Sequence, residues 1–327
     1  MNKRTILAAV AILILVIFSQ RKTIAADKVV IAYPTTSSQF APLWFAKDVG
    51  IYQKYGLDPQ LVYIRGFNLI QGMVAGEVNL SQTAVAGALL AIIRGADLRF
   101  IAITAKIFPY TLVANKNIKT PKDLKGGTIA INRLADVSEI ASRIALRKLG
   151  IDPERDVTML QVGGSPQRLA ALQSGSVDAA ALDFMSGLKM RKAGFNVLAR
   201  LNLNYPYLGL LASRDFMQEK PTATENFVRA FVDSVARFRK NREEGIKVIS
   251  KYMKSNEMDL VTQAYDFIAE DFYADNLEPD RKGFKLLLEE LSAREPQAKN
   301  ARMNQFVDLT VIHKLENEGF FKKTFGK

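Results

Sequence analysis

The sequence predicts an α/β fold made of two similar lobes, and three observations support this prediction. From residue 27 onward, apolar segments with the two-residue period of strands alternate with segments that have the 3.6-residue period of helices. Three short motifs recur in the same order about a hundred residues later. The chain has 327 residues, of which 48% are hydrophobic, so it is long enough to bury two cores.

The first lobe begins with alternating strands and helices. An apolar strand is followed by a polar loop and by a helix that carries Leu43, Trp44 and Ile51. Short connections between strands and helices favour a sheet with helices on its faces. The strands are expected at 29–33, 61–64, 80–83 and 100–104, the polar loop at 34–39, and the later helices at 68–75 and through residues 89 and 93.

The second lobe is centred on a strand, a loop and a helix. β-Branched residues predict a strand at 128–131, and the apolar period that follows predicts a helix that ends at Gly150. Residues 132–138 therefore open a helix, where unpaired backbone N–H groups and the helix dipole favour a small anion or a polar ligand. Asp136 and Ser138 could instead serve only as helix caps, and the sequence leaves both interpretations open.

Short motifs of the first lobe are echoed in the second. The helix ends share glycine, which supplies a C-cap, and the valine that follows restarts a buried strand. Three echoes in one order indicate two lobes with the same local geometry. The pairs are KYGLDP (54–59) with KLGIDP (148–153), AGEVN (75–79) with SGSVD (174–178), and VIAY (30–33) with TIAI (128–131).

Two apolar strands flank the second lobe, at 110–115 and 207–213, and we expect them to be crossover strands that join the lobes. The second lobe is then an insertion at 116–207. The first lobe is formed by 27–115 and 208–327, and the last third of it is almost wholly helical.

Residues 1–26 have the features of a cleavable export signal. Lys3 and Arg4 precede an apolar run, and small residues come before Asp27. Without this segment the net charge falls from +12 to about +8. We expect export to the periplasm or another extracytoplasmic location, although Arg21 and Lys22 leave an uncleaved anchor as an alternative.

The composition excludes several kinds of site. Cysteine is absent and histidine occurs once, which removes thiol catalysis, disulfides and most histidine-based triads. We therefore expect no catalytic residues, no cofactor and no metal. The basic residues are scattered along the helices, so no nucleic-acid partner is expected.

A cleft between two such lobes is where a ligand is expected, because strand ends and helix starts from both sides face it. Closure of the lobes by a hinge motion would remove the ligand from water. From the first lobe the candidate ligand-binding residues are Thr35, Ser37, Ser38, Gln39, Phe67, Asn68, Thr83 and Ala84. From the second lobe they are Asn132, Arg133, Ser138 and Asp183.

Seven short segments carry a resemblance to a known family. They are APLWFA with GIY (41–46 and 50–52), YGL (55–57), GEVN (76–79), RGAD (94–97), DLKG (123–126) and ALQSGSVDAA (171–180). In this order they resemble the solute-binding proteins of ABC importers, in the group for aliphatic sulfonates, taurine, nitrate and the pyrimidine precursor of thiamine.

The resemblance implies a periplasmic-binding-protein fold of the second type, with an ABC permease and an ATPase as partners of a monomeric receptor. Asn79 stands where the family usually has aspartate, a difference that concerns the start of a strand. The cysteine-rich signature of the pyrimidine-synthesising branch is absent from this sequence, so that enzymatic activity is not expected.

The ligand class remains open at this point. Arg133 could hold a sulfonate or carboxylate at the helix start, or it could point to solvent. Asp183, if it faces the cleft, favours a ligand with an amine, a hydroxyl or a ring N–H.

We expect a receptor for a small organic anion or zwitterion. The alternatives are a receptor for an aromatic or pyrimidine-type ligand, and a ligand-sensing ectodomain. An enzyme would have to use Ser37, Ser38 or Ser165 with Asp183 or a lysine as the base.

Overall fold

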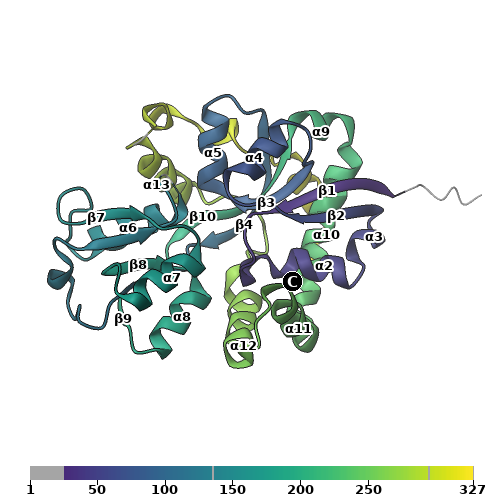
Figure 1. The fold of residues 1–327 in the computed structure, drawn as a ribbon. Coiled ribbons are helices and arrows are strands. Elements are labelled where there is room, and N and C mark those ends of the chain that lie inside the picture. Colours follow the sequence, from purple (N-terminus) through teal and green to yellow (C-terminus); the bar gives the residue numbers. More distant parts are fainter. Residues whose placement is uncertain (1–25, 135, 294, 327) are drawn as a thin grey trace, which may run out of the picture.

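The computed structural model describes residues 26–134, 136–293 and 295–326. These residues form two lobes, each built on a five-stranded mixed sheet, and the chain passes between the lobes twice (Figure 1). The predicted export signal at 1–26 lies outside the described residues, apart from Ala26. Within the described ranges, no helix combines the length and the apolar character needed to cross a membrane.

The first sheet has the strand order β2-β1-β3-β10-β4. Strand β1 runs parallel to β2 and β3, whereas β10 is antiparallel to β3 and β4. Strand β2 begins at Leu57, earlier than the start predicted at residue 61. Pro59 is tolerated within the strand because β2 lies at the edge of the sheet, where a missing backbone N–H breaks no ladder. The strands are β1 (Asp27–Tyr33), β2 (Leu57–Tyr63), β3 (Leu80–Ala84), β4 (Leu98–Ile107) and β10 (Asn204–Ser213).

The second sheet repeats this plan with the order β7-β6-β8-β5-β9. Strand β6 runs parallel to β7 and β8, and β5 is antiparallel to β8 and β9. The antiparallel strand takes the same position in both sheets. The strands are β5 (Tyr110–Ala114), β6 (Thr128–Ile131), β7 (Thr158–Gln161), β8 (Ala179–Leu182) and β9 (Asn196–Leu201).

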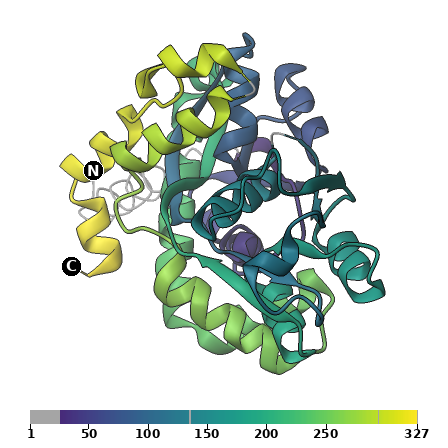
Figure 2. The ribbon, with the colours of Figure 1, turned by 90° about the vertical axis from the view of Figure 1, so that its left-hand side faces the viewer.

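Helices cover the faces of both sheets, and the long C-terminal ones pack on the first lobe (Figures 1 and 2). In the first lobe they are α2 (Ala41–Asp48), α3 (Ile51–Lys54), α4 (Phe67–Val74), α5 (Val85–Ile93), α9 (Arg214–Glu219), α10 (Pro221–Lys240), α11 (Arg242–Met253), α12 (Met258–Phe267), α13 (Arg281–Ser292), α14 (Thr310–Asn317) and α15 (Phe320–Phe325). In the second lobe they are α6 (Val137–Lys148), α7 (Ser165–Ser174) and α8 (Phe184–Lys192). Shorter helical turns are η1 (Ser38–Phe40), η2 (Pro121–Leu124), η3 (Ile268–Phe272), η4 (Pro296–Asn300) and η5 (Met303–Gln305).

The repeated motifs have the same structural role in each lobe. The side chain of Asn79 accepts a hydrogen bond from the backbone N–H of Val30 at 2.8 Å. The carboxylate of Asp178 accepts one from the N–H of Thr128 at 2.7 Å. Asn79 and Asp178 stand directly before β3 and β8, and each side chain satisfies a backbone N–H of the neighbouring strand that would otherwise lack a partner. The predicted repeat is confirmed, and the Asn79 difference concerns a strand start, as expected.

The chain changes sheet earlier than the sequence predicted. Residues 110–114 form β5 of the second sheet rather than an end of the first lobe, and β10 of the first sheet begins at Asn204 rather than near 207. The expected boundaries at 115/116 and 207/208 were therefore wrong by a few residues. Apolar strands have the same sequence pattern in either sheet, so only the pairing shows where each belongs.

Two adjacent short connectors form the hinge region between the sheets. One lies between the end of β4 and the start of β5, and the other lies between β9 and β10. The backbone N–H of Phe108 donates to the carbonyl of Leu203 at 3.2 Å, so the connectors are hydrogen-bonded to each other. The two sheets are thus joined by a pair of hydrogen-bonded connectors.

Helix α12 of the first lobe also contacts helix α8 of the second. Met185, Leu260 and Ala264 form a small buried cluster between these helices. Two ion pairs, Lys189 with Glu257 and Lys192 with Asp259, link the same region on the surface. Figure 2, which faces the second lobe, shows the green helices of the first lobe beneath it. The lobes are thus joined by packing as well as by the connectors.

Replacing Gly283 with alanine is expected to destabilise the fold by about 1–3 kcal/mol, because a Cβ at this position overpacks α13 against β10. That Cβ would lie 2.7 Å from the carbonyl oxygen of Asn204, a backbone atom that cannot rotate away. Urea denaturation measures the change. The control is Gly87→Ala, where no atom lies within 4 Å of the new Cβ, and an equal loss of stability in both variants would contradict the packing argument.

Candidate functional site

A cavity of about 420 Å³ lies between the two lobes, a volume typical of small-molecule sites. The carboxyl ends of β1, β3 and β6 and the first turns of α4, α5, α6 and α7 meet around it. From the first lobe the lining residues include Pro34, Thr35, Gln39, Phe40, Tyr63, Arg65, Gly66, Asn68, Thr83, Ala84, Gly87 and Ala88. Around the connectors and in the second lobe they include Tyr110, Asn132, Arg133, Asp136, Val137, Ser165, Arg168, Tyr207 and Leu208.

Seven of the twelve candidate residues line this cavity: Thr35, Gln39, Asn68, Thr83, Ala84, Asn132 and Arg133. They lie at strand ends and helix starts of both lobes. This is the position for which they were predicted from the sequence. Ser37, Ser38, Ser138 and Asp183 are outside the lining. The side chain of Phe67 lies outside the described part of the structure.

Ser138 and Asp136 organise the start of α6. The carboxylate of Asp136 accepts hydrogen bonds from the N–H and the hydroxyl of Ser138, at 2.9 and 2.8 Å. It also accepts one from the side-chain amide of Asn132 at 2.9 Å, and the N–H of Asn132 donates to Ser138 Oγ. This closed set of bonds caps the helix and fixes the loop that presents Asn132 and Arg133 to the cavity.

Asp183 likewise caps a helix. It is buried at the start of α8, and its carboxylate accepts a hydrogen bond from the N–H of Ser186 at 3.0 Å. A capping carboxylate satisfies an N–H that has no partner within the helix. The position of Asp183 therefore has a structural reason, and a role of this residue in binding stays a prediction.

Arg168 is the functional candidate that sequence reasoning missed. It lies in α7, its exposed fraction is 2%, and it lines the cavity. Its guanidinium donates to the carbonyls of Ala181 and Gly163, at 3.1 and 2.8 Å, and to Ser165 Oγ at 3.1 Å. Three of its five N–H donors are thereby used.

Arg168 has no carboxylate partner in the described part of the chain, where every oxygen that it contacts is neutral. A buried charge is costly unless it is paired. The sequence held one signal for it, since Arg168 lies four residues before Leu172 and therefore shares the buried face of α7. An arginine on an apolar helix face indicates a special role.

Positive side chains outnumber negative ones around the cavity. Arg65, Arg133 and Arg168 line it, whereas Asp136 is the carboxylate among the lining residues. Arg65 extends across the gap from the first lobe, with Nη2 3.8 Å from the position that a Cβ on Gly163 would take. The cavity is thus suited to an anion that contacts both lobes.

Two buried tyrosines, Tyr110 and Tyr207, line the cavity. Burial raises the pKa of the Tyr110 and Tyr207 hydroxyls, which therefore remain protonated donors. The Tyr207 hydroxyl donates to Gln39 Oε1 at 2.9 Å, and the Tyr273 hydroxyl donates to the backbone carbonyl of Gln39. These bonds hold Gln39 in place from behind.

Replacing Tyr207 with phenylalanine is expected to lower the free energy of unfolding by about 1–2 kcal/mol, because Gln39 Oε1 loses its donor while buried. Chemical denaturation measures this change. The control is Tyr63→Phe, which removes the hydroxyl of a tyrosine that is 51% exposed and should alter stability little. Equal stability of the Tyr207 variant and the native protein would show that water replaces the lost donor.

The chain matches a family model, a relative in sequence and several solved structures. A family model described as "NMT1/THI5 like" matches residues 37–245. A protein of Escherichia coli (strain K12), named as an aliphatic sulfonates-binding protein, is 26% identical over 193 residues. That match covers 58% of this chain and 60% of the relative, so the chain spans less than two thirds of that protein's length.

Solved structures match over nearly the whole chain. The periplasmic aliphatic sulphonate binding protein SsuA from Escherichia coli superposes with a TM-score of 0.71 at 20% identity, covering 88% of this chain and 99% of that one. The periplasmic nitrate-binding protein NrtA from Synechocystis PCC 6803 gives a TM-score of 0.71 at 13% identity, covering 90% and 89%. The two-lobed periplasmic-binding-protein fold predicted from the sequence is confirmed.

Proposed function

Because the chain belongs to the NMT1/THI5-like family, we propose that it is a solute-binding protein of an ABC importer that captures a small organic anion or zwitterion. The family resemblance drawn from the sequence motifs is confirmed by the family match. The relatives named for sulfonates and nitrate support an anionic oxygen-rich solute. The cavity between the lobes is the proposed site.

The single observation that carries this proposal is the buried Arg168. Arg168 lines the cavity, and its guanidinium has two N–H donors beyond the three that are used within the protein. A sulfonate, carboxylate or nitrate oxygen would accept these donors and neutralise the charge. The ligand would thus take the place of the missing counter-ion.

We propose that the two lobes close over the bound solute. Arg65 and Asn68 belong to the first lobe, and Arg133 and Arg168 belong to the second, so a solute between them contacts both. The pairs of donors approach one another when the lobes rotate about the connectors, and closure excludes water from the bound anion. The closed lobes would then present a joint surface to the permease.

The proposed cellular setting follows from the same family. The relatives described as periplasmic support an extracytoplasmic location, with residues 1–26 as the export signal and a permease and ATPase as partners. The protein would bind its solute without converting it. A chain with one histidine and no cysteine has few of the side chains that activate a nucleophile.

A thermal-shift screen with the mature chain tests the solute class. The panel contains alkanesulfonates, taurine, nitrate, aromatic carboxylates, amino acids and pyrimidines. A solute that binds only the folded state at 100 times its Kd stabilises that state by about 2.7 kcal/mol, which raises Tm by several degrees. Saturable shifts with an anionic class support the proposal, and shifts confined to neutral pyrimidines would replace it with the aromatic alternative.

Closure and absence of turnover need separate measurements. The chain contains no cysteine, so Glu77→Cys with Lys122→Cys introduces one label site in each lobe, and both native residues are exposed. A solute-dependent rise in energy transfer between the two dyes would support closure. Recovery of the solute unchanged after long incubation would support a receptor, whereas a new product would show an enzyme.

A further inference from the structure

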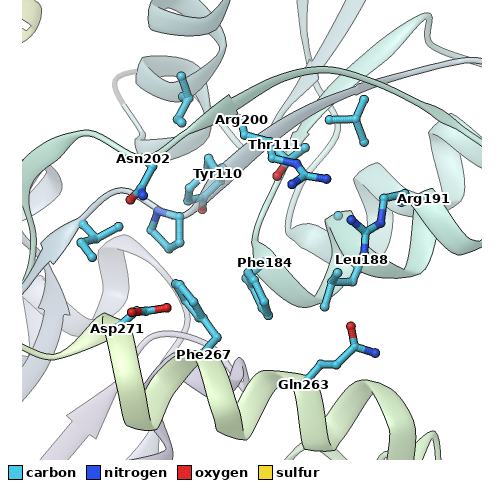
Figure 3. A pocket seen from close by; sticks show the side chains of 15 residues that line it. Tyr110, Thr111, Phe184, Leu188, Arg191, Arg200, Asn202, Gln263, Phe267 and Asp271 are labelled. Carbon is cyan, nitrogen blue, oxygen red and sulfur yellow. The ribbon is translucent and has the colours of Figure 1, made fainter.

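A second cavity, of about 480 Å³, lies on the side of the connectors where α8 meets α12 and η3 (Figure 3). Here it is called the hinge-side cavity. Among the described lining residues it shares only Tyr110 with the cleft cavity, so the two spaces are distinct. The second lobe supplies one wall through α8 and β9, and the first lobe supplies the other through α12 and η3.

The wall from the second lobe is positively charged. Arg191 of α8 and Arg200 of β9 both line the hinge-side cavity, and Figure 3 shows both side chains extending toward it. Neither arginine has a hydrogen-bonded or ion-paired partner in the described part of the chain. The neighbouring Lys189 and Lys192 differ, since they pair with Glu257 and Asp259 of the first lobe.

Two aromatic rings, Phe184 of α8 and Phe267 of α12, also line the cavity, one from each lobe. The rings of Phe184 and Phe267 stack across the lobes, with centroids 4.1 Å apart and planes at 11°. Gln263 and Asp271 stand beside Phe267 on the wall of the first lobe (Figure 3). An apolar stack next to two unpaired guanidinium groups matches a molecule that has one flat apolar part and one anionic group.

We propose that the hinge-side cavity is a second binding site, for an aromatic organic anion. The anionic group contacts Arg191 and Arg200, and the ring packs against the outside of the Phe184–Phe267 stack, because the facing surfaces of these two rings already contact each other. This site is separate in space from the solute site in the cleft, with Tyr110 as the residue that both line. Because its two walls belong to different lobes, its ligand favours the lobe arrangement in which the walls fit together, and the two sites are therefore linked.

The test uses 4-bromobenzenesulfonate as the probe and the Arg168→Gln variant as the background, so that binding in the cleft is weakened. Crystals of the mature variant are soaked, and anomalous diffraction locates the bromine. A bromine peak beside Phe184 and Phe267 supports the proposal. A peak in the cleft alone, or no peak, overturns it. Neither result depends on whether the protein serves an importer.

Titration calorimetry in the same background measures the contribution of the arginines. Arg191→Gln with Arg200→Gln is expected to weaken binding of the probe about tenfold or more, because two charge-assisted contacts are lost. The matched control is Lys119→Gln with Lys122→Gln, which removes two exposed positive charges elsewhere on the second lobe. If both double variants weakened binding of the probe equally, the loss would be a general effect of charge, and the proposed site would be wrong.

Discussion

Replacing Arg168 with glutamine is expected to weaken binding of the anionic solute by about 2–3 kcal/mol, which corresponds to about a 100-fold higher Kd. The guanidinium is buried, lines the cleft and has no carboxylate partner in the described part of the protein. An anion that meets this charge gains hydrogen bonds in an environment that water screens little. Glutamine keeps a polar side chain but removes the charge. Titration calorimetry with the best anion from the screen gives both Kd values.

Three controls accompany this experiment. Arg168 also supports the carbonyls of Ala181 and Gly163, so the unfolding free energy of each ligand-free variant is measured in parallel. Arg155→Gln removes an exposed arginine of the same lobe and should leave Kd unchanged. Arg168→Lys keeps the charge without the planar fork and should give an intermediate Kd. Native affinity in Arg168→Gln would exclude this arginine as the anion contact.

Replacing Phe231 with alanine is expected to lower the free energy of unfolding by about 3–5 kcal/mol, because it opens a cavity in the core of the first lobe. Phe231 lies in α10 and is 1% exposed. Its ring contacts the edge of Tyr273 at 5.4 Å between centroids, and the Tyr273 hydroxyl binds the backbone of Gln39. The loss of packing therefore also loosens one wall of the cleft, and we expect weaker solute binding. Urea denaturation and calorimetry measure the two effects.

The control for this variant is Val74→Ala, which truncates an apolar side chain that is 60% exposed and should change stability by less than about 0.5 kcal/mol. Phe231→Leu fills most of the same volume and should lie between the native protein and the alanine variant. If Phe231→Ala lost no more stability than Val74→Ala, α10 would not contribute to the core as the structure indicates.

Much of the fold could be predicted because each lobe repeats local signals. Glycine C-caps and strand-start side chains such as Asn79 and Asp178 leave a pattern in the sequence, since they bond to residues of a neighbouring strand in a fixed way. The exact crossover could not be predicted. Residues 110–114 have the apolar pattern that either sheet accepts, and their membership depends on pairing with β8 and β9.

The candidate site was predicted in outline for a related reason. Strand ends and helix starts point to a shared edge of a sheet, so Thr35, Asn132 and Arg133 could be selected by position. The sequence does not show whether a polar residue at a helix start caps the helix or faces a cavity. Asp183 caps α8, whereas Arg168 lies one turn into α7 and faces the cavity. Both outcomes depend on which helix face packs on the sheet.

The position of β10 in the first sheet affects the order in which the molecule can assemble. The second sheet is made entirely of residues between Tyr110 and Leu201, so it can form as soon as that stretch is available. The first sheet has β10 between β3 and β4, and it stays divided until residues up to Ser213 join it. Pairing of such distant segments is slow, because a long loop must be closed first. The inserted lobe can therefore be complete while the lobe that encloses it in sequence is still two separate pieces.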